Sequence, residues 1–270
     1  RGVATYRCRM AKAMFTCAPV RPTGNWHGQA PCLWVRTEFM DDESPSVPPR
    51  TNSAASGRVR DPEGTRERIL DAARDEFSSV GLGGGRVASI AERAGVNKQL
   101  LYYYFNNKER LYGAVLERAY RDIRKREMAL DLDALPPVEA LRKFIHFNFD
   151  YTVENRYFVP LLNDENLHKA RHAKASKEIP ALQDSMKSSL GRVIRRGLDD
   201  GSFRRDADPV ELYISIASLC YFFLSNRYTL SVIFESDLLE SDRIAARRTH
   251  VSEMILSYLR TAPDPPPLQD

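Results

Sequence analysis

Residues 87–110, VASIAERAGVNKQLLYYYFNNKER, predict two short helices joined by a tight turn. Apolar residues recur at helical spacing along the first helix, which gives it one buried face: Val87, Ile90, Ala91 and Ala94. Gly95 follows them, where a helix commonly ends in the left-handed conformation that glycine adopts at little cost. We expect Leu101 and either Tyr104 or Phe105 to return the second helix to the same core. This layout is typical of a helix-turn-helix DNA-binding module.

The second helix leaves polar and aromatic side chains on its outer face: Lys98, Gln99, Tyr102 and Tyr103. A glutamine can form two hydrogen bonds with an adenine edge, a lysine can reach guanine or phosphate, and tyrosine hydroxyls can contact the DNA backbone. The alternative is an amphipathic hairpin whose aromatic groups contact another part of the protein. Three adjacent tyrosines are unusual on a solvated surface, because large apolar groups in one patch normally mark an interface. The whole pattern therefore favours DNA.

The stretch from about Thr65 to Leu116 resembles the amino-terminal domain of the TetR family of bacterial transcription regulators. The similarity runs through the motifs TRERILDAA, FSSVG, SIAERAGV, LLYYYF and NKERLY. It implies a three-helix DNA-binding domain, a fourth connecting helix and an all-helical carboxy-terminal domain that dimerises and binds a small effector. By position, the resemblance also implies a recognition helix and a phosphate-contacting lysine after it: Asn97, Lys98, Gln99, Tyr102 and Tyr103 on the helix, then Lys108.

The chain departs from the family pattern just before the second helix, where threonine or serine is usual. It has Gly83, Gly84, Gly85 and Arg86 instead. A hydroxyl there would cap the helix and bond a phosphate. Glycine also caps tolerably, and its backbone N–H at a helix start can itself meet a phosphate. We therefore expect Gly85 and Arg86 to contact DNA from a loop that is looser than usual.

Length and charge are compatible with such a protein. The 270 residues have room for one or two domains, and no apolar run approaches membrane-spanning length. Residues 58–126 carry 15 Lys and Arg against 10 Asp and Glu, whereas residues 127–270 carry 18 against 22. This asymmetry fits a basic DNA-facing domain attached to an acidic remainder. We expect a cytoplasmic protein with no membrane partner.

The four cysteines and five histidines indicate neither a metal site nor a cofactor. No two cysteines have C-x-x-C spacing, and the histidines do not complete a zinc ligand set. His168 and His172 can share a helix face, but we interpret them as a surface pair. We expect Cys220 to be a small buried residue. No Ser-His-Asp order, glycine-rich phosphate loop or metal constellation indicates an enzyme.

Composition divides the chain into five segments, with Leu135-Pro136-Pro137 as the main boundary. We expect a disordered or non-native extension over 1–57, a helix-turn-helix domain over 58–110, a connecting helix over 111–134, an effector-binding and dimerisation domain over 135–261 and a disordered tail over 262–270. A transit peptide is an alternative for the basic residues up to Glu38, and Met40 is a plausible start. Arg58 and Arg60 form either a minor-groove arm or solvated tail charges.

Helical periodicity without an alternating strand pattern predicts an all-α fold, with a three-helix helix-turn-helix domain and a larger helical domain. The first helix is expected from Asp61 or Thr65 to about Ser79, and the fourth from Lys108 to about Glu127. The inner stripe of the first helix is Ile69, Ala73, Phe77 and Val80. Five more helices are expected at about 138–154, 157–170, 178–199, 208–235 and 241–260. Basic residues near the end of the fourth helix either face DNA or form a solvated helix end: Arg118, Arg121, Arg124, Lys125 and Arg126.

A mixture of aromatic and polar side chains over residues 144–168 marks the candidate effector site. The candidates there and in the later apolar segment are Phe144, Phe147, Asn148, Tyr151, Asn163, Asn166, His168, Phe222 and Asn226. The alternative is that the aromatic stripe is simply core and that the amides cap or brace a helix. The pattern favours a small, partly aromatic or amphipathic organic ligand.

The segment 210–234 is apolar almost all round, so its helix needs cover on several sides. Self-pairing across a two-fold axis, through helices 208–235 and 241–260, provides that cover and sets two recognition helices on the half-sites of a palindrome. The leading interpretation is a homodimeric repressor that a small effector releases from a palindromic double-stranded DNA operator. The alternatives are an effector-independent architectural DNA-binding protein of the same fold and an enzyme using the carboxy-terminal pocket.

Overall fold

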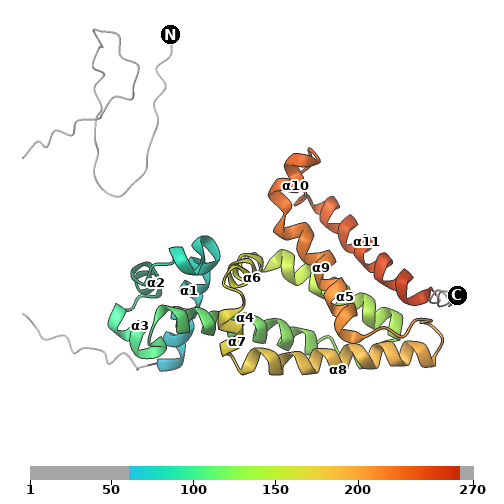
Figure 1. Ribbon diagram of the computed structural model, residues 1–270, viewed down its shortest axis with the longest axis horizontal. Coiled ribbons are helices and arrows are strands. Elements are labelled where there is room, and N and C mark those ends of the chain that lie inside the picture. Colours follow the sequence, from blue (N-terminus) through green and yellow to red (C-terminus); the bar gives the residue numbers. More distant parts are fainter. Residues whose placement is uncertain (1–60, 262–270) are drawn as a thin grey trace, which may run out of the picture. The chain divides into compact units, whose positions relative to one another are not determined.

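The computed structural model describes residues 61–261, in which every regular element is a helix (Figure 1). The helices are α1 (Pro62–Gly84), α2 (Val87–Ala94), α3 (Lys98–Phe105), α4 (Lys108–Met128), the short 3-10 helix η1 (Leu132–Ala134), α5 (Pro137–Glu154), α6 (Phe158–Leu167), α7 (Arg171–Ala175), α8 (Glu178–Asp199), α9 (Pro209–Ser225), α10 (Arg227–Ile233) and α11 (Ser241–Arg260). Among these described helices, none is long and apolar enough to cross a membrane. The expectations for the amino-terminal extension, for Arg58 and Arg60, and for the 262–270 tail lie outside the described residues.

The first apolar core joins α1, α2, α3 and α4. Ile69 and Phe77 of α1, Ile90 of α2, Leu101 of α3 and Leu111 of α4 are all fully buried in it. Each of these short helices thus contributes at least one large side chain to a shared core. Because α3 uses only its inner side for this packing, its outer side remains free.

Helix α1 runs further than expected and bends at Gly81. The backbone there is left-handed, with a φ of +70°, and a Cβ atom would lie 2.5 Å from the Asp164 carboxylate. Only glycine fits both demands at little cost. The bend turns Val80 outward to 53 % exposure, so its expected place on the inner stripe is wrong.

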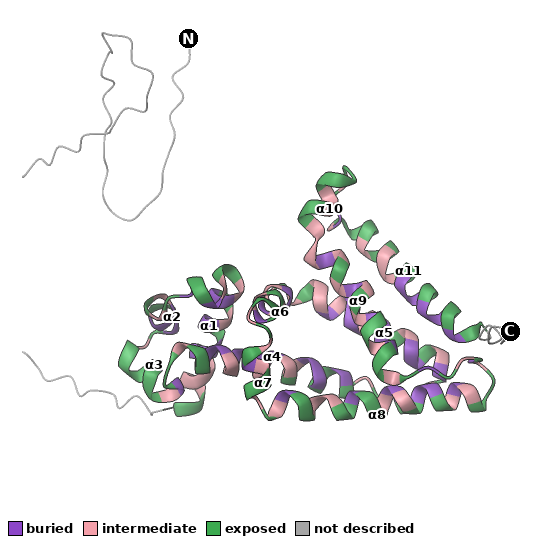
Figure 2. Ribbon diagram, in the orientation of Figure 1, coloured by how far each residue is buried: buried purple, intermediate pink, exposed green. Residues whose placement is uncertain are grey.

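The second apolar core joins α5, α8, α9 and α11. Its fully buried members include Phe149 of α5, Leu190 of α8, Ile216 of α9 and Val251 of α11. Figure 2 shows buried and exposed positions alternating along α8 and α11, as expected for helices that pack on one side. Helix α4 is packed against both the first core and α8, so it physically connects the two parts of the chain.

Two expected helices are each interrupted. The expected helix at 157–170 is α6, and α7 begins at Arg171 after Lys169 and Ala170 adopt positive φ values. The expected helix at 208–235 divides at Asn226 into α9 and α10. Helix α10 has no buried residue, and in Figure 1 it lies at the upper end of α9, beside the start of α11.

Most of the basic residues near the end of α4 do not form a free positive surface. Arg118 pairs with Glu67 and Asp71 of α1, Arg121 pairs with Glu178 of α8, and Arg126 pairs with Asp122 one turn back. Arg124 is buried and binds Glu127 and the Tyr213 hydroxyl. Four of the five residues in the expected run are therefore engaged within the protein, and only Lys125 has no such partner among the described contacts.

Candidate DNA interface and effector cavity

The turn between α2 and α3 has the geometry that its sequence predicts. Gly95 adopts the left-handed conformation, and the Val96 N–H donates to the Ala91 carbonyl at 2.9 Å. These bonds satisfy carbonyl groups at the end of α2. Asn97 then caps α3, because its side chain accepts a hydrogen bond from the Leu100 N–H at 2.7 Å. Asn97, one of the expected DNA contacts, is thus also the N-cap of α3.

The outer side of α3 presents the four side chains expected there. Lys98 and Gln99 are exposed in its first turn, and Tyr102 and Tyr103 follow one turn later. Tyr103 is 83 % exposed, and its ring packs edge-on against Tyr104 with centroids 5.6 Å apart. An ammonium group, an amide and two phenols therefore form one solvent-facing strip on a helix whose opposite side is buried.

The start of α2 is held by a buried carboxylate. Glu76 is 8 % exposed, and it accepts the Arg86 N–H at 3.0 Å and the Arg93 guanidinium at 3.4 Å. The Gly85 N–H donates to Gly81 and is not free, and Arg86 rather than a glycine occupies the capping position. The expectation of a bare glycine N–H for a phosphate is therefore wrong.

Gly85 has a packing role. It is buried, and a Cβ atom there would lie 2.7 Å from the Phe77 ring. Its φ of −61° is open to any residue, so close approach rather than backbone conformation requires glycine. Arg86 itself is exposed beside α2. The glycine run therefore brings α2 close to α1 and leaves the Arg86 side chain in solvent.

Lys108 lies at the start of α4, close to the glycine run. Asn107 caps this helix by accepting the Arg110 N–H at 2.8 Å, and the Lys108 Nζ atom is 3.4 Å from the Gly83 carbonyl. A helix N-terminus carries a partial positive charge that favours anions. Lys108 thus adds a full charge where the helix already attracts a phosphate.

A cavity of about 310 Å³, here called the central cavity, lies between α4, α5, α6 and α9. Its wall contains only uncharged side chains: Tyr120, Ile123, Asn148, Thr152, Phe158, Leu162, Asn166, Tyr213, Ile214, Ala217, Ser218, Cys220 and Tyr221. Burial raises the pKa of Tyr120 and of the Cys220 thiol to about 12 each, so both groups remain neutral at physiological pH. Such a wall suits an uncharged or amphipathic ligand with aromatic surface and a few hydrogen-bonding groups.

The structure gathers only part of the expected effector site at this cavity. Asn148 and Asn166 line it, and Asn163 binds the hydroxyl of Tyr221, which also lines it. Phe222 is exposed on the outer side of α9, and Asn226 caps that helix through the Phe222 carbonyl.

The remaining candidates lie elsewhere. Phe147 and Tyr151 pack beside Phe158, and the Tyr151 hydroxyl donates to Asp122 on α4 at 3.1 Å. Phe144 belongs to the second apolar core, and His168 is 2.7 Å from the Asp164 carbonyl through its Nδ1 atom. None of these four side chains lines the central cavity.

The main wall residues that sequence reasoning missed are the tyrosines. Tyr213, Ala217 and Tyr221 recur at four-residue spacing on α9, next to the buried stripe that includes Ile216 and Cys220. That spacing is the available signal, because it predicts a second stripe of α9 facing a neighbouring helix. Tyr120 on α4 carries no comparable signal, since only the fold brings α4 to the cavity.

Helix α6 contacts both the cavity and the DNA-binding part. Leu162 and Asn166 face the cavity, whereas Asp164 accepts the Leu82 N–H at 3.0 Å, directly after the bend in α1. The carbonyl of Leu161 also accepts the Tyr112 hydroxyl of α4 at 3.3 Å. Helix α6 is therefore hydrogen-bonded to both α1 and α4 while it also lines the central cavity.

His172 strengthens the same junction from α7. It is buried, its Nδ1 atom is 2.7 Å from Glu165, and its ring lies 4.8 Å from that of Tyr112. The expectation of a surface pair with His168 is therefore wrong. Among the described residues, no group of three metal-binding side chains could hold an ion.

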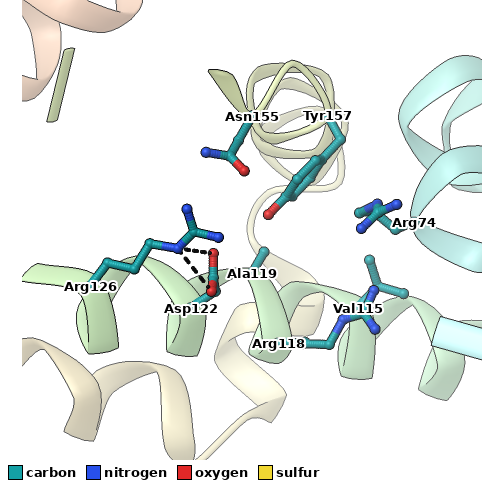
Figure 3. Close-up of a pocket in the computed structure, with 8 residues that line it drawn as sticks. All are labelled: Arg74, Val115, Arg118, Ala119, Asp122, Arg126, Asn155 and Tyr157. Carbon is teal, nitrogen blue, oxygen red and sulfur yellow. Dashed lines mark hydrogen bonds and ion pairs between the residues drawn. The ribbon is translucent and has the colours of Figure 1, made fainter. Parts of the chain in front are cut away.

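A cleft of about 230 Å³ lies beside this junction, between α1, α4 and the segment before α6 (Figure 3). Three arginines line it, but all three also pair with carboxylates: Arg74 with Asp71 and Asp75, Arg118 with Glu67 and Asp71, and Arg126 with Asp122. The Arg74 guanidinium also lies 5.0 Å from the centre of the Tyr157 ring. These contacts join α1 to α4 and to Tyr157. Because carboxylates neutralise the three arginines, the cleft does not favour an anion.

Comparisons with known proteins agree with this arrangement. The family described as "Bacterial regulatory proteins, tetR family" matches residues 69–115, and the one described as "Tetracyclin repressor-like, C-terminal domain" matches residues 137–255. The chain is 39 % identical over 203 residues to the HTH-type transcriptional repressor NicS of Pseudomonas putida, and the match covers 75 % of this chain and 96 % of that protein.

Solved structures show the same fold. A TetR-family regulatory protein from Rhodococcus RHA1 has a TM-score of 0.58 at 19 % identity, covering 74 % of this chain and 98 % of that one. The transcriptional regulator SCO4942 from Streptomyces coelicolor has a TM-score of 0.55 at 24 % identity, covering 72 % and 97 %.

Proposed function

Because the chain belongs to the TetR family of bacterial transcription regulators, we propose that it is a homodimeric repressor released from a palindromic operator by a small organic effector. It is a DNA-binding transcriptional regulator and not an enzyme, as its family and its similarity to a repressor along nearly the whole length of that relative establish. The proposal concerns the operator symmetry, the dimer, the effector and the residues that serve each.

The single observation that carries the DNA-binding proposal is the free outer side of α3. Gln99 is placed to read a base, Lys98 a base or a phosphate, and Tyr102 and Tyr103 the backbone. Leu101, on the opposite side, is fully buried and holds the strip outward. A rigid helix that presents such groups suits the major groove.

Flanking groups support phosphate contacts on both sides of α3. Arg86 is exposed at the start of α2, and Lys108 stands at the start of α4. Asn97 retains its amide nitrogen for DNA while its oxygen caps α3. Gly85 contributes indirectly, because its lack of a side chain lets α2 approach Phe77.

The dimer proposal rests on apolar side chains that the single chain leaves in water. Phe222 of α9, and Met254 and Tyr258 of α11, are each about half exposed, and none of them lines the central cavity. Patches of this kind normally mark an interface, and a two-fold pairing of the same helices is the simplest way to cover both copies. It would also present two α3 helices to a palindrome.

The effector proposal rests on the central cavity and on the position of α6. A ligand that fits the cavity better when α6 is displaced would also favour a different arrangement of α1 and α4. Ligand binding then weakens operator binding by the ratio of the ligand's affinities for the two arrangements. The uncharged wall supports a small aromatic or amphipathic effector.

A selection of bound sequences from random DNA, repeated in the presence of candidate metabolites, tests the whole proposal. The expected result is a palindromic consensus that one metabolite abolishes. That metabolite should also raise the Tm of wild-type protein, whereas an architectural DNA-binding protein would show neither response. Recovery of sequences without a consensus would contradict the repressor proposal.

A further inference from the structure

Polar side chains on the α5 and α6 side of the central cavity donate their hydrogens within their own helices. The Asn148 Nδ2 atom donates to the Phe144 carbonyl at 3.0 Å, and the Thr152 hydroxyl donates to the Asn148 carbonyl at 2.8 Å. The Asn166 Nδ2 atom donates to the Leu162 carbonyl, also at 2.8 Å. In each case the side-chain oxygen accepts no bond from the described residues. This side of the wall is therefore rich in hydrogen-bond acceptors.

Asn148 is the enclosed amide of this set. It is 5 % exposed, whereas Asn166 is exposed, so water can bind the Asn166 oxygen. In the described part of the chain no residue donates to the Asn148 Oδ1 atom, yet this atom is not among the side-chain atoms that are both inaccessible and unpaired. Because Asn148 lines the central cavity, the accessible surface of its oxygen lies there. A buried acceptor without a donor is costly, so a ligand that donates to it gains affinity.

Neighbouring acceptors fix the direction of the Asn148 amide. Its nitrogen faces the Phe144 carbonyl, and the side chain also interacts with the buried Glu127 carboxyl. Burial raises the pKa of Glu127, while the Arg124 charge and the Asn148 amide oppose that rise, which an amide does by donating its N–H. A flipped amide would turn its oxygen toward a carbonyl and a carboxylate, and both would repel it. The Asn148 oxygen is therefore held toward the cavity.

The tyrosines of the wall add aromatic surface without a competing requirement. The hydroxyls of Tyr213 and Tyr221 are bound to side chains that do not line the cavity. The Tyr120 hydroxyl has no partner among the described residues, but a hydroxyl can either donate or accept. The rings offer packing surface for a planar apolar body. Asn148 differs from Tyr120 because its polarity is fixed, so it selects the ligand group placed against it.

We propose that the effector of the central cavity is an aromatic compound with an N–H or O–H group on its ring, and that this group donates to the Asn148 Oδ1 atom. The aromatic body packs on the tyrosine rings. An analogue of the same shape without the donor would displace water from Asn148 and leave its oxygen unpaired. This inference rests on the effector function proposed for the cavity and adds the ligand group that the cavity requires.

Indole and benzofuran test the donor requirement, with titration calorimetry on the full chain as the measurement. The two bicyclic probes have nearly the same shape, but indole has a ring N–H where benzofuran has an ether oxygen. Indole is expected to bind at least about tenfold more tightly, because only indole can donate to Asn148. Absence of indole binding, equal affinities or a preference for benzofuran would overturn the proposal.

Two matched substitutions assign the donor contact. Asn148→Leu removes the enclosed acceptor while keeping the number of heavy atoms, and it is expected to reduce the indole preference to within about twofold. Asn166→Leu makes the same change at an exposed wall position and is expected to leave the preference intact. The readout is the ratio of the two affinities, because a general loosening of the cavity would weaken both probes. An Asn148→Leu protein that keeps the full preference would contradict the contact.

A third variant locates the probes. Ala217→Phe narrows the central cavity and is expected to weaken binding of both probes at least about tenfold, so unchanged affinities would overturn the proposal. Operator binding by the ligand-free protein, measured by fluorescence anisotropy, reports separately on the repressor proposal. A protein that binds an operator but does not prefer indole contradicts only the donor requirement. A protein that prefers indole but binds no operator contradicts the repressor proposal instead.

Discussion

The outer side of α3 and the outer side of α9 are both free in the single chain, yet they expose opposite chemistry. Helix α3 exposes Lys98, Gln99 and two phenols, whereas α9 exposes Phe222, which does not line the central cavity. Water is a good solvent for the first set and a poor one for the second. The difference indicates which partner each surface suits: a charged, hydrogen-bonding polymer for α3, and an apolar protein surface for α9.

The same two helices also differ in how they are anchored. Leu101 and Phe105 hold the eight-residue α3 from behind, and a capped turn sets its direction. Helix α9 is longer and has a continuous buried stripe, including Ile216 and Cys220, so its exposed side can carry a large apolar residue such as Phe222. A short helix can present polar groups rigidly only if its few inner residues pack well.

The largest effect on stability is expected when substitutions on the two sides of α3 are compared. Leu101→Ala should lower the free energy of unfolding by about 3 kcal/mol, because it opens a cavity in a fully packed core. Tyr103→Ala should change it by less than about 0.5 kcal/mol, because that ring is solvent-exposed. Urea unfolding at one protein concentration measures both. Equal losses would mean that the tyrosine side packs within its own subunit.

The next effect concerns the apolar surface of α9. Phe222→Glu places two charges in a symmetric interface, at a cost of about 3 kcal/mol per dimer, so the dimer Kd should rise about 100-fold. Leu167→Glu is the matched control, because Leu167 is also an exposed apolar residue but lies on α6. Analytical ultracentrifugation measures the Kd. An unchanged Kd for Phe222→Glu would remove this side of α9 from the interface.

A smaller pair of effects distinguishes base reading from phosphate binding. Gln99→Ala should reduce discrimination at one base pair by about 1–3 kcal/mol, whereas Lys108→Ala should weaken binding to all sequences and lower the salt slope by about 1. Fluorescence anisotropy with operator and random DNA over a range of salt concentrations tests both. If the two variants behave alike on both DNAs, the assigned roles are wrong.

The smallest effect concerns the polar contact between α4 and α8. The Nε atom and one Nη atom of Arg121 each donate to the Glu178 carboxylate at 2.7 Å, and these bonds hold the pKa of Glu178 below its ordinary value of 4.5. The stabilisation is thus complete above pH 4.5 and is lost as the pH falls through the lowered value. Since the pair is partly exposed, Glu178→Gln should cost under about 1 kcal/mol at pH 7 and less than that at pH 3. Urea unfolding at the two pH values measures this, and an equal cost at both would contradict the ion pair.

The all-helical fold and the free side of α3 were predictable because their signals are local. Helix α3 follows a glycine turn and an asparagine cap, and the helices α4, α5, α8 and α11 have strong periodicity. The interruptions after α6 and α9 were not predictable. Lys169, Ala170 and Asn226 occupy them, and none of these residues is a strong helix breaker, so tertiary packing decides where the chain turns.

The central cavity was predictable only in part, because it depends on which helices meet. Asn148 and Asn166 were found as amides within apolar stretches, which is a local signal. Tyr120 and Tyr213 became wall residues only once α4 and α9 were placed against α5 and α6. Phe144 is also an aromatic residue on a helix, but it packs in the second apolar core and does not line the central cavity. The composition of one helix does not reveal between which neighbouring helices a cavity lies.

The hydrogen bond from Leu82 to Asp164 matters for anyone who builds hybrid regulators from this chain. A graft that joins its amino-terminal part to a foreign carboxy-terminal half would separate the Gly81 bend from the Asp164 carboxylate that accepts this N–H. On the proposed mechanism, such a chimera would keep its operator preference but would no longer respond to the effector. Transplanting α6 together with α1 would preserve the connection, so the natural unit of exchange includes both helices.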